Sequence, residues 1–391
     1  MNTIIIVLKK ELKDTLRDRR TLISAIIIPA LIIPLLLIGV TKLQTSLMKK
    51  EGDKKLKIAL IGNSENYRAQ LEDPGFKIFS NYKVDDAKTA VTNDSLDAII
   101  EFQPDFASNV DSLKSGTMNL YYKSTNLMLY KRVSEKLEML KTQILDERIK
   151  KLNISKETLT AFNVNKVDIS TAKEVLGKTI GGFLPYIFII FCFTACMYPA
   201  IDLITGEKEK GTMETLLSSP ASRFQILIGK MLTISIVGLS AALMTIVGMV
   251  VGLKFLPNIP QDFLATINDM VSAKFLIMLF AMLIPLSIFF AGILSATVIR
   301  AKSFKEAQTM VTPMMFVIII PAMLAMIPGV VLNWQTAFIP ILNIALATKQ
   351  IIAGTINLAM YATIVFSLIA FALLAAFVSY KQFSKESMVL K

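Results

Sequence analysis

A run of 25 residues without a charged side chain, FLIMLFAMLIPLSIFFAGILSATVI, occupies positions 275–299 of the chain. Each residue of an α-helix advances about 1.5 Å, and the hydrocarbon core of a membrane is roughly 30 Å thick, so about 20 apolar residues are needed to cross it. The run exceeds that length. It therefore predicts a membrane-spanning helix.

Similar apolar runs recur on both sides of this one. The 391-residue chain is 53% apolar with a mean hydropathy of +0.57, and the excess over a soluble protein is concentrated in these runs. The first run follows a basic segment, as in a signal peptide, but it is longer than the roughly 7–15 apolar residues of such a peptide, so we expect it to be retained. The sequence thus predicts an α-helical polytopic membrane protein with six transmembrane helices, at residues 21–41, 179–201, 231–253, 275–299, 309–331 and 359–380.

Residues 42–178, between the first and second predicted spans, are polar and mixed in character. Short apolar stretches of strand character lie at Lys57–Gly62, Leu96–Phe102 and Thr117–Tyr122. From Leu127 to Leu152 the apolar residues change to helical spacing. A segment of about 130 residues can bury a core of its own, so we predict a compact α/β domain here.

Basic residues predict the orientation of the spans. With the N-terminus in the cytoplasm, the cytoplasmic segments carry sixteen Lys and Arg residues and the short outer loops carry three. This asymmetry follows the positive-inside rule, which does not apply to a domain as long as 42–178. We therefore expect both termini in the cytoplasm, with 42–178 outside, a loop at 202–230 and a tail at 381–391 inside. The formal charge of +12 then reflects this arrangement and does not indicate nucleic-acid binding.

Two further segments are predicted to lie at the membrane surface or to enter it only part of the way. Residues 1–20 place Ile5, Leu8 and Leu12 at helical spacing among Lys and Arg, which indicates an amphipathic interface helix in contact with membrane lipids. Residues 332–358 are apolar but broken into short pieces, which is typical of re-entrant or extracellular short helices. A kinked seventh span is the alternative, and it would place the C-terminus outside.

The chain has no histidine, and its two cysteines, Cys192 and Cys196, lie within one apolar run. The absence of histidine excludes imidazole catalysis and the commonest metal ligand. Two thiols alone do not complete a zinc site, and cysteine is a common small apolar residue. We therefore predict that the cysteines share a helix face as packing residues, and that the chain has no catalytic residue, metal site or cofactor site.

The segment GEKEKGTMETLLSSP, at positions 206–220, follows the second span. Gly211 interrupts the chain, Thr212 can cap a short helix, and Glu214 in its first turn complements the helix dipole. Pro220 suits the first position of the next helix. The apolar side of the short helix is formed by Met213, Leu216 and Leu217. Such an amphipathic helix can insert into a groove on a partner protein.

The pattern Glu-x-Glu-x-Gly-Thr-x-Glu-x-Leu-Leu-x-x-Pro in this loop resembles the signature of the ABC type-2 exporter permease family. The resemblance covers essentially the whole chain and is nearest to the permease subunits of bacterial sodium-efflux systems. In that family the loop forms a coupling helix that docks on the ATPase subunit. The resemblance therefore implies an ATPase-coupling role for Glu207, Glu209, Gly211, Thr212, Glu214, Leu217 and Pro220.

The resemblance also implies partners and a location. The expected assembly contains two copies of an ABC ATPase and a permease homodimer in the bacterial cell membrane, with ATP and Mg bound on the ATPase. The chain itself contains no Gly-x-x-x-x-Gly-Lys-Ser/Thr phosphate loop. We therefore expect it to be a membrane subunit and not an enzyme.

Sodium is the cargo that the resemblance favours, and the cores of the predicted spans contain no charged residue that could mark its path. Carbonyl and hydroxyl groups can meet a cation where a helix is broken. This singles out Pro340, Asn343 and Thr348 as a tentative translocation path. An antibiotic, peptide or lipid is the alternative cargo. A mechanotransmission complex that acts on an extracellular partner, or a scaffold without an ATPase, is the alternative class.

Overall fold

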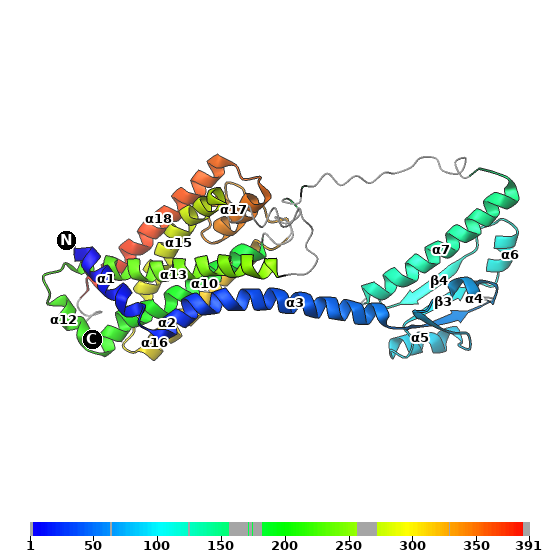
Figure 1. Ribbon diagram of the computed structural model, residues 1–391, viewed down its shortest axis with the longest axis horizontal. Helices are drawn as coiled ribbons and strands as arrows, with labels where there is room; N and C mark the ends of the chain where they lie inside the picture. Colours follow the sequence, from blue (N-terminus) through cyan, green and yellow to red (C-terminus); the bar gives the residue numbers. More distant parts are fainter. Residues whose placement is uncertain are drawn as a thin grey trace. The chain divides into compact units, whose positions relative to one another are not determined.

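The computed structural model describes residues 3–62, 65–123, 126–155, 171, 174, 182–255, 272–327 and 329–385 (Figure 1). The chain divides into a membrane unit, residues 1–41 with 169–391, and a sheet unit, residues 42–168. The predicted end of the outer domain at residue 178, the start of the second span at residue 179 and most of the tail at 381–391 lie outside the described residues.

The membrane unit consists of helices. Within the described residues, six helices are long and apolar enough to cross a membrane: Ile23–Leu43, Phe183–Glu209, Arg223–Lys254, Ala273–Val298, Phe304–Leu324 and Leu358–Phe383. The elements are α1 (Thr3–Thr15), α2 (Arg19–Leu22), η1 (Ile23–Ile27), α3 (Ile28–Asp53), α10 (Phe183–Ala200), η2 (Ile201–Gly206), α11 (Glu207–Glu209), α12 (Thr212–Leu217), α13 (Arg223–Lys254), α15 (Ala273–Val298), α16 (Phe304–Leu324), η3 (Thr336–Phe338), α17 (Leu342–Ala353) and α18 (Leu358–Phe383). The prediction of a polytopic helical membrane protein is confirmed.

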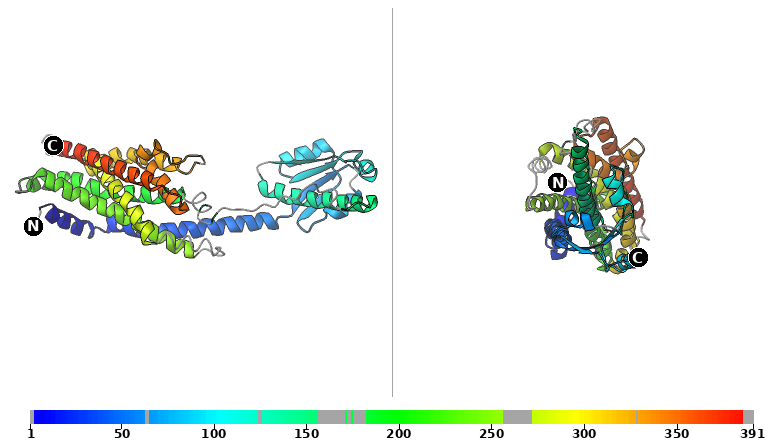
Figure 2. Two further views of the ribbon diagram at one scale, coloured as in Figure 1. Left: turned by 90° about the horizontal axis from the view of Figure 1, so that it is seen from above. Right: turned by 90° about the vertical axis from the view of Figure 1, so that its right-hand side faces the viewer.

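Small residues bring the long helices close together. α15 and α18 lie side by side (Figures 1 and 2), and a Cβ atom added at Gly292 of α15 would lie 2.8 Å from the Cβ atom of Ala375 in α18. Gly238 of α13 faces Cys192 and Cys196 of α10 in the same way. Both cysteines are free and buried, and the Cys196 thiol donates to the Ile234 carbonyl at 3.5 Å. Membrane helices associate through such close backbone approach.

α17 lies inside the bundle, where it contacts α10, α15, α16 and α18. Its 12 residues are too few to cross a membrane. The helix follows Ile341, which has a φ of 75°. A β-branched residue is strained by on the order of 1–3 kcal/mol in such a conformation, and the surrounding packing must hold it.

The sheet unit has four strands in the order β2-β1-β3-β4. β1 pairs in parallel with β2 and β3, whereas β4 is antiparallel to β3. The strands are β1 (Leu56–Ile61), β2 (Phe76–Phe79), β3 (Ala98–Phe102) and β4 (Met118–Tyr122), and the helices are α4 (Glu65–Leu71), α5 (Val84–Thr92), α6 (Phe106–Asp111) and α7 (Leu127–Leu152). β1, β3, β4 and α7 lie at the stretches predicted from the sequence, whereas β2 was not predicted, because its four residues are too few to show a strand pattern.

Alternating side chains give the sheet two buried faces. Ile58 and Ile100 point toward the side covered by α4, α6 and α7, and Val133 of α7 is fully buried against them. Ala59 and Ile99 point to the opposite side, which α5 covers. The period-2 alternation of a strand therefore accounts for both cores.

Candidate functional site

The second membrane-spanning helix ends in an irregular, tightly held turn. α10 passes into the wide turn η2, then into the short α11, and the chain reverses at Gly211 with a φ of 71°. Glycine adopts this left-handed conformation without steric cost. α12 then begins at Thr212. The prediction that Thr212 caps α12 is wrong, because Gly211 is the N-cap and the Thr212 hydroxyl donates to the Glu207 carbonyl at 3.2 Å instead.

α12 has one buried side and one exposed side. Met213 is buried in the hydrophobic core of the membrane unit, and Leu216 and Leu217 are half-buried against that core. Glu214 and Thr215 are exposed. The short helix thus exposes a polar side, while its apolar side is held against the protein core.

The start of the next helix differs from the prediction. Pro220 lies in the turn and is exposed, and α13 begins at Arg223. Ser222 is its N-cap: the Ser222 hydroxyl accepts from the Gln225 amide, while the Gln225 side chain accepts from the Ser222 amide. This reciprocal capping box satisfies two otherwise free amides, so the helix begins after Ser222.

A buried ion cluster lies directly behind the loop. The Lys230 side chain on α13 is 0% exposed, and its Nζ atom lies 2.7 Å from Glu207 Oε2 and 3.1 Å from Glu11 Oε1. It also donates to the Leu203 carbonyl of η2 at 2.8 Å. Glu207 Oε2 accepts no hydrogen bond at this geometry, so its contact with Lys230 is an ion pair. We call Lys230, Glu11 and Glu207 the Lys230 cluster.

Lys10 closes the cluster on its exposed side. Its Nζ atom lies 3.2 Å from Glu11 and 3.6 Å from Glu207, with about half of the side chain exposed. Partial burial is the largest single influence on Lys10 and acts to lower its pKa. The carboxylates of Glu11 and Glu207 outweigh it, and the pKa of Lys10 is raised above its ordinary value. The four side chains therefore balance two positive charges against two negative ones.

The opposite side of the loop contacts the junction of α15 and α16. The buried Thr205 hydroxyl donates to the Val298 carbonyl at 2.8 Å, and Lys208 donates to the Ile299 carbonyl at 3.3 Å. Glu209 accepts from the Phe304 amide at 2.8 Å, at the first residue of α16. Carboxylates are favourable at a helix N-terminus, so this contact joins the loop to α16. The predicted residues Glu207 and Glu209 thus attach opposite sides of the loop: Glu207 contacts Lys230 of α13, and Glu209 contacts the start of α16.

The N-terminal helix contacts protein along the stripe Val7, Glu11 and Thr15, which is buried. Val7 lies over Gly229 of α13, where an added Cβ atom would approach its Cγ1 atom to 2.6 Å. Within the predicted lipid-facing stripe, Ile5 is exposed, and Leu8 and Leu12 are half-buried. Apolar spacing alone missed the packed stripe because two of its three members are polar.

The roles of Lys230 and Glu11 were not predicted. Lys230 was counted among the basic residues of the loop at 202–230, and Glu11 of the interface helix was not singled out. The one available signal was a lysine at the start of an otherwise uncharged run of α13. A lysine at the end of an apolar run usually extends its ammonium group to the membrane interface, so this signal did not indicate a buried partner.

The tentative path residues lie elsewhere: Pro340 precedes α17, and Asn343 and Thr348 lie within it. Pro340 is half-buried, and Asn343 and Thr348 are fully buried. The Asn343 amide donates to the Ala337 carbonyl at 2.9 Å, and the Thr348 hydroxyl donates to the Ile344 carbonyl at 2.8 Å. Both side chains therefore bond to carbonyls within residues 337–348. Within the described residues, no three His, Cys, Asp or Glu side chains come together as a metal site.

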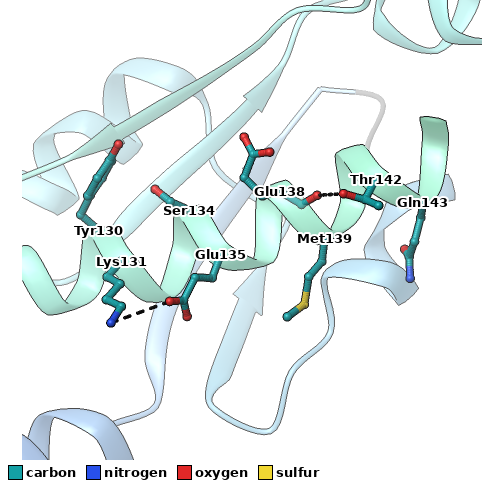
Figure 3. A pocket seen from close by; sticks show the side chains of 8 residues that line it. All are labelled: Tyr130, Lys131, Ser134, Glu135, Glu138, Met139, Thr142 and Gln143. Atoms are coloured by element: carbon teal, nitrogen blue, oxygen red, sulfur yellow. Dashed lines mark hydrogen bonds and ion pairs between the residues drawn. The ribbon is translucent and has the colours of Figure 1, made fainter. Parts of the chain in front are cut away.

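Two pockets contrast in character. One of about 420 Å³ lies between the end of α16 and α17, with Met326, Leu346 and Val330 on its walls and Lys349 and Glu174 beside them. The other, of about 860 Å³, is a surface hollow on α7 alone (Figure 3). Its polar side chains contact neighbours along the same helix, as Lys131 does with Glu135 at 4.0 Å (Figure 3). The first is therefore the better-enclosed cavity.

Comparison with known proteins agrees with this architecture. The sequence profile of the ABC-2 family transporter proteins matches residues 19–381. The chain is also 24% identical over 367 residues to the ABC transporter permease protein NatB of Bacillus subtilis, and the match covers 89% of each chain. No solved structure matches. The resemblance based on the loop at Glu207–Pro220 is confirmed, and the chain belongs to the ABC-2 family of transporter proteins as a multi-pass membrane permease subunit.

Proposed function

We propose that this permease couples ATP hydrolysis on two separate ABC ATPase subunits to the export of sodium ions, as a homodimer in the bacterial cell membrane with both termini in the cytoplasm. ATP and Mg are bound by the ATPase subunits. The observation that carries the proposal is the loop at 206–220, where α12 exposes a polar face on a base held by Met213 and by contacts with α13, α15 and α16. A partner that pushes on this helix acts on several spans at once.

The docking role is proposed for Glu207, Glu209, Gly211, Thr212, Glu214, Leu217 and Pro220. These residues act in different ways. Glu214 is exposed to the partner, Gly211 sets the direction of α12, and Glu207 and Glu209 hold the loop to the spans. Short amphipathic helices that dock in a groove on a partner are a common mode of protein recognition.

Sodium as the cargo rests on the resemblance to sodium-efflux permeases. Pro340, Asn343 and Thr348 remain the proposed path, through backbone carbonyls around the break before α17. The test is a flux measurement with the purified permease and ATPase in liposomes, using radioactive sodium with and without ATP. We expect ATP-dependent sodium movement, and its absence in a complex that hydrolyses ATP would overturn the sodium assignment.

An organic amphiphile is the second candidate cargo. The pocket of about 420 Å³ between α16 and α17 combines apolar walls with Lys349 and Glu174, and its volume lies within the range of small-molecule sites. An amphiphile presents the matching combination of an apolar body and a charged group. In the same liposomes, ATP-dependent movement of a fluorescent amphiphile without movement of sodium would favour this candidate.

Reversing the charge of Glu214 is expected to weaken ATPase binding by at least about tenfold, because a docking surface matched to a carboxylate repels an ammonium group. The effect of Glu214→Lys on folding is small, since an exposed charge near a helix end contributes about 0.3–1 kcal/mol. The measurement is the affinity of the purified permease for its ATPase subunit. Asp86→Lys is the matched control, because Asp86 is an exposed acid in the first turn of α5 in the sheet unit. Equal binding by Glu214→Lys and wild type would contradict the docking role of α12.

A further inference from the structure

We propose that the Lys230 cluster is a joint between the N-terminal helix α1, the loop at 206–220, here called the coupling loop, and α13. The joint makes these three elements move as one body, and Lys230 is its positioning residue. The inference rests on the proposed coupling function and names the route by which motion of α12 enters the spans. Each member of the cluster comes from a different element: Glu11 from α1, Glu207 from α11 and Lys230 from α13.

Stability alone does not explain the cluster. Lys230 and Glu11 are 0% and 2% exposed, and the loss of hydration on burying charges offsets much of their attraction. Apolar side chains of similar volume usually stabilise a folded core as well as a buried ion pair does. What the ions add is geometric specificity, because each charge is satisfied in one arrangement of the three elements. The cluster therefore determines register more than it contributes net stability.

The same energetics make the joint stiff. Separating α1 or α11 from α13 leaves a buried charge without its partner, which disfavours the separated state by a factor on the order of 100 to 5000. The Lys230 ammonium also donates to the Leu203 carbonyl, so η2 is included in the joint. Val7 packs over Gly229 beside it, so α1 and α13 are matched in shape as well as in charge.

The linkage on the other side of the loop is weaker. The buried Thr205 hydroxyl donates one neutral hydrogen bond to the Val298 carbonyl, the contact between Glu209 and the Phe304 amide is exposed, and Lys208 donates a long hydrogen bond of 3.3 Å. A neutral hydrogen bond changes an equilibrium by about tenfold, and one to a charged group by about 10- to 100-fold, which is less than the effect of separating buried ions. Motion of α12 is therefore transmitted rigidly to α1 and α13, whereas its hydrogen bonds to the junction of α15 and α16 yield more easily.

The first experiment uses the permease alone. Spin labels are placed at the exposed positions Lys13 on α1 and Thr215 on α12, after Cys192 and Cys196 are replaced by alanine. The distance distribution between the labels is expected to be narrow in the otherwise native protein. In the triple variant Lys230→Met, Glu11→Gln and Glu207→Gln, which leaves no lone charge in the cluster, we expect the distribution to broaden at least about twofold. An unchanged distribution would overturn the joint.

The second experiment tests transmission in the unlabelled complex. The triple variant changes Glu207, which is one of the proposed docking residues, so the rate of ATP hydrolysis is measured with enough permease to saturate the ATPase subunit for both wild type and variant. We expect the permease-dependent change in the rate of ATP hydrolysis to be at least about fivefold smaller in the triple variant than in wild type. A triple variant that binds and alters hydrolysis as wild type does would refute transmission through the cluster.

A matched control neutralises an ion pair outside the loop. Lys54→Met with Asp97→Asn removes the pair at 2.8 Å in the sheet unit and should leave both measurements unchanged. If this control also broadened the distance distribution and reduced the permease-dependent change in ATP hydrolysis, general destabilisation would explain the results for the triple variant, and the proposed joint would be overturned. Failure of the proposed function is separate, since the wild-type permease would then neither bind the ATPase subunit nor alter its hydrolysis.

Discussion

Gly211→Pro is expected to abolish ATP-driven export and to reduce ATPase binding more than any change at an exposed position of the loop. Gly211 has a φ of 71°, whereas proline holds φ near −65°. Proline also removes the amide that donates to the Lys208 carbonyl at 3.2 Å and disfavours the helical conformation of Lys210. These effects together cost about 3 kcal/mol or more locally, enough to redirect α12. The measurements are ATPase binding and ATP-dependent flux in liposomes.

The chain offers a closely matched control. Gly354, at the end of α17, has a φ of 73°, and its amide donates to the Ile351 carbonyl at 3.1 Å. Gly354→Pro therefore imposes the same backbone change at a site outside the coupling loop, and we expect it to leave ATPase binding intact. Gly211→Ala, which keeps the amide and costs only about 1–2 kcal/mol of left-handed strain, should give an intermediate loss. Wild-type binding by Gly211→Pro would show that the direction of α12 is irrelevant to docking.

Gly292→Val is expected to destabilise the membrane unit by about 3 kcal/mol. The added Cβ atom would lie 2.8 Å from the Ala375 Cβ atom and 2.9 Å from the Ala375 carbonyl carbon. The second contact is with backbone, which cannot rotate away as a side chain can, so α15 and α18 must separate. Overpacking of this kind typically costs 1–3 kcal/mol, and we expect the upper end of that range, about 3 kcal/mol. The measurement is the unfolding midpoint of the purified permease in detergent.

Gly39→Val controls for the effect of valine in a membrane helix. An added Cβ atom at Gly39 of α3 meets nothing within 4 Å, so this substitution tests helix propensity without a packing clash. We expect its unfolding midpoint to remain near that of wild type. Gly292→Ala should lower the midpoint by less than Gly292→Val, since it adds the clashing atom without the two branches. A higher midpoint for Gly292→Val would mean that the helices have room to separate.

Features that depend on length and local composition could be predicted from the sequence. Long uncharged runs indicated a six-helix membrane protein, because crossing a membrane requires a minimum apolar length whatever the helices contact. The strands β1, β3 and β4 followed from apolar runs, and the loop motif predicted the family. The exact helix start was not predicted: Pro220 was expected at the first position of α13, whereas the helix begins at Arg223, after the cap at Ser222.

The Lys230 cluster could not be predicted in this way. Glu11 lies 219 positions before Lys230, and nothing local to either residue indicates the other. The sequence by itself determined that this is a polytopic membrane permease of the ABC-2 family, because hydropathy and the loop motif at 206–220 depend on residues that are close together along the chain. Only the tertiary structure decided which charges are buried and which elements they join. Whether an ion is solvated or paired depends on which distant segments surround it.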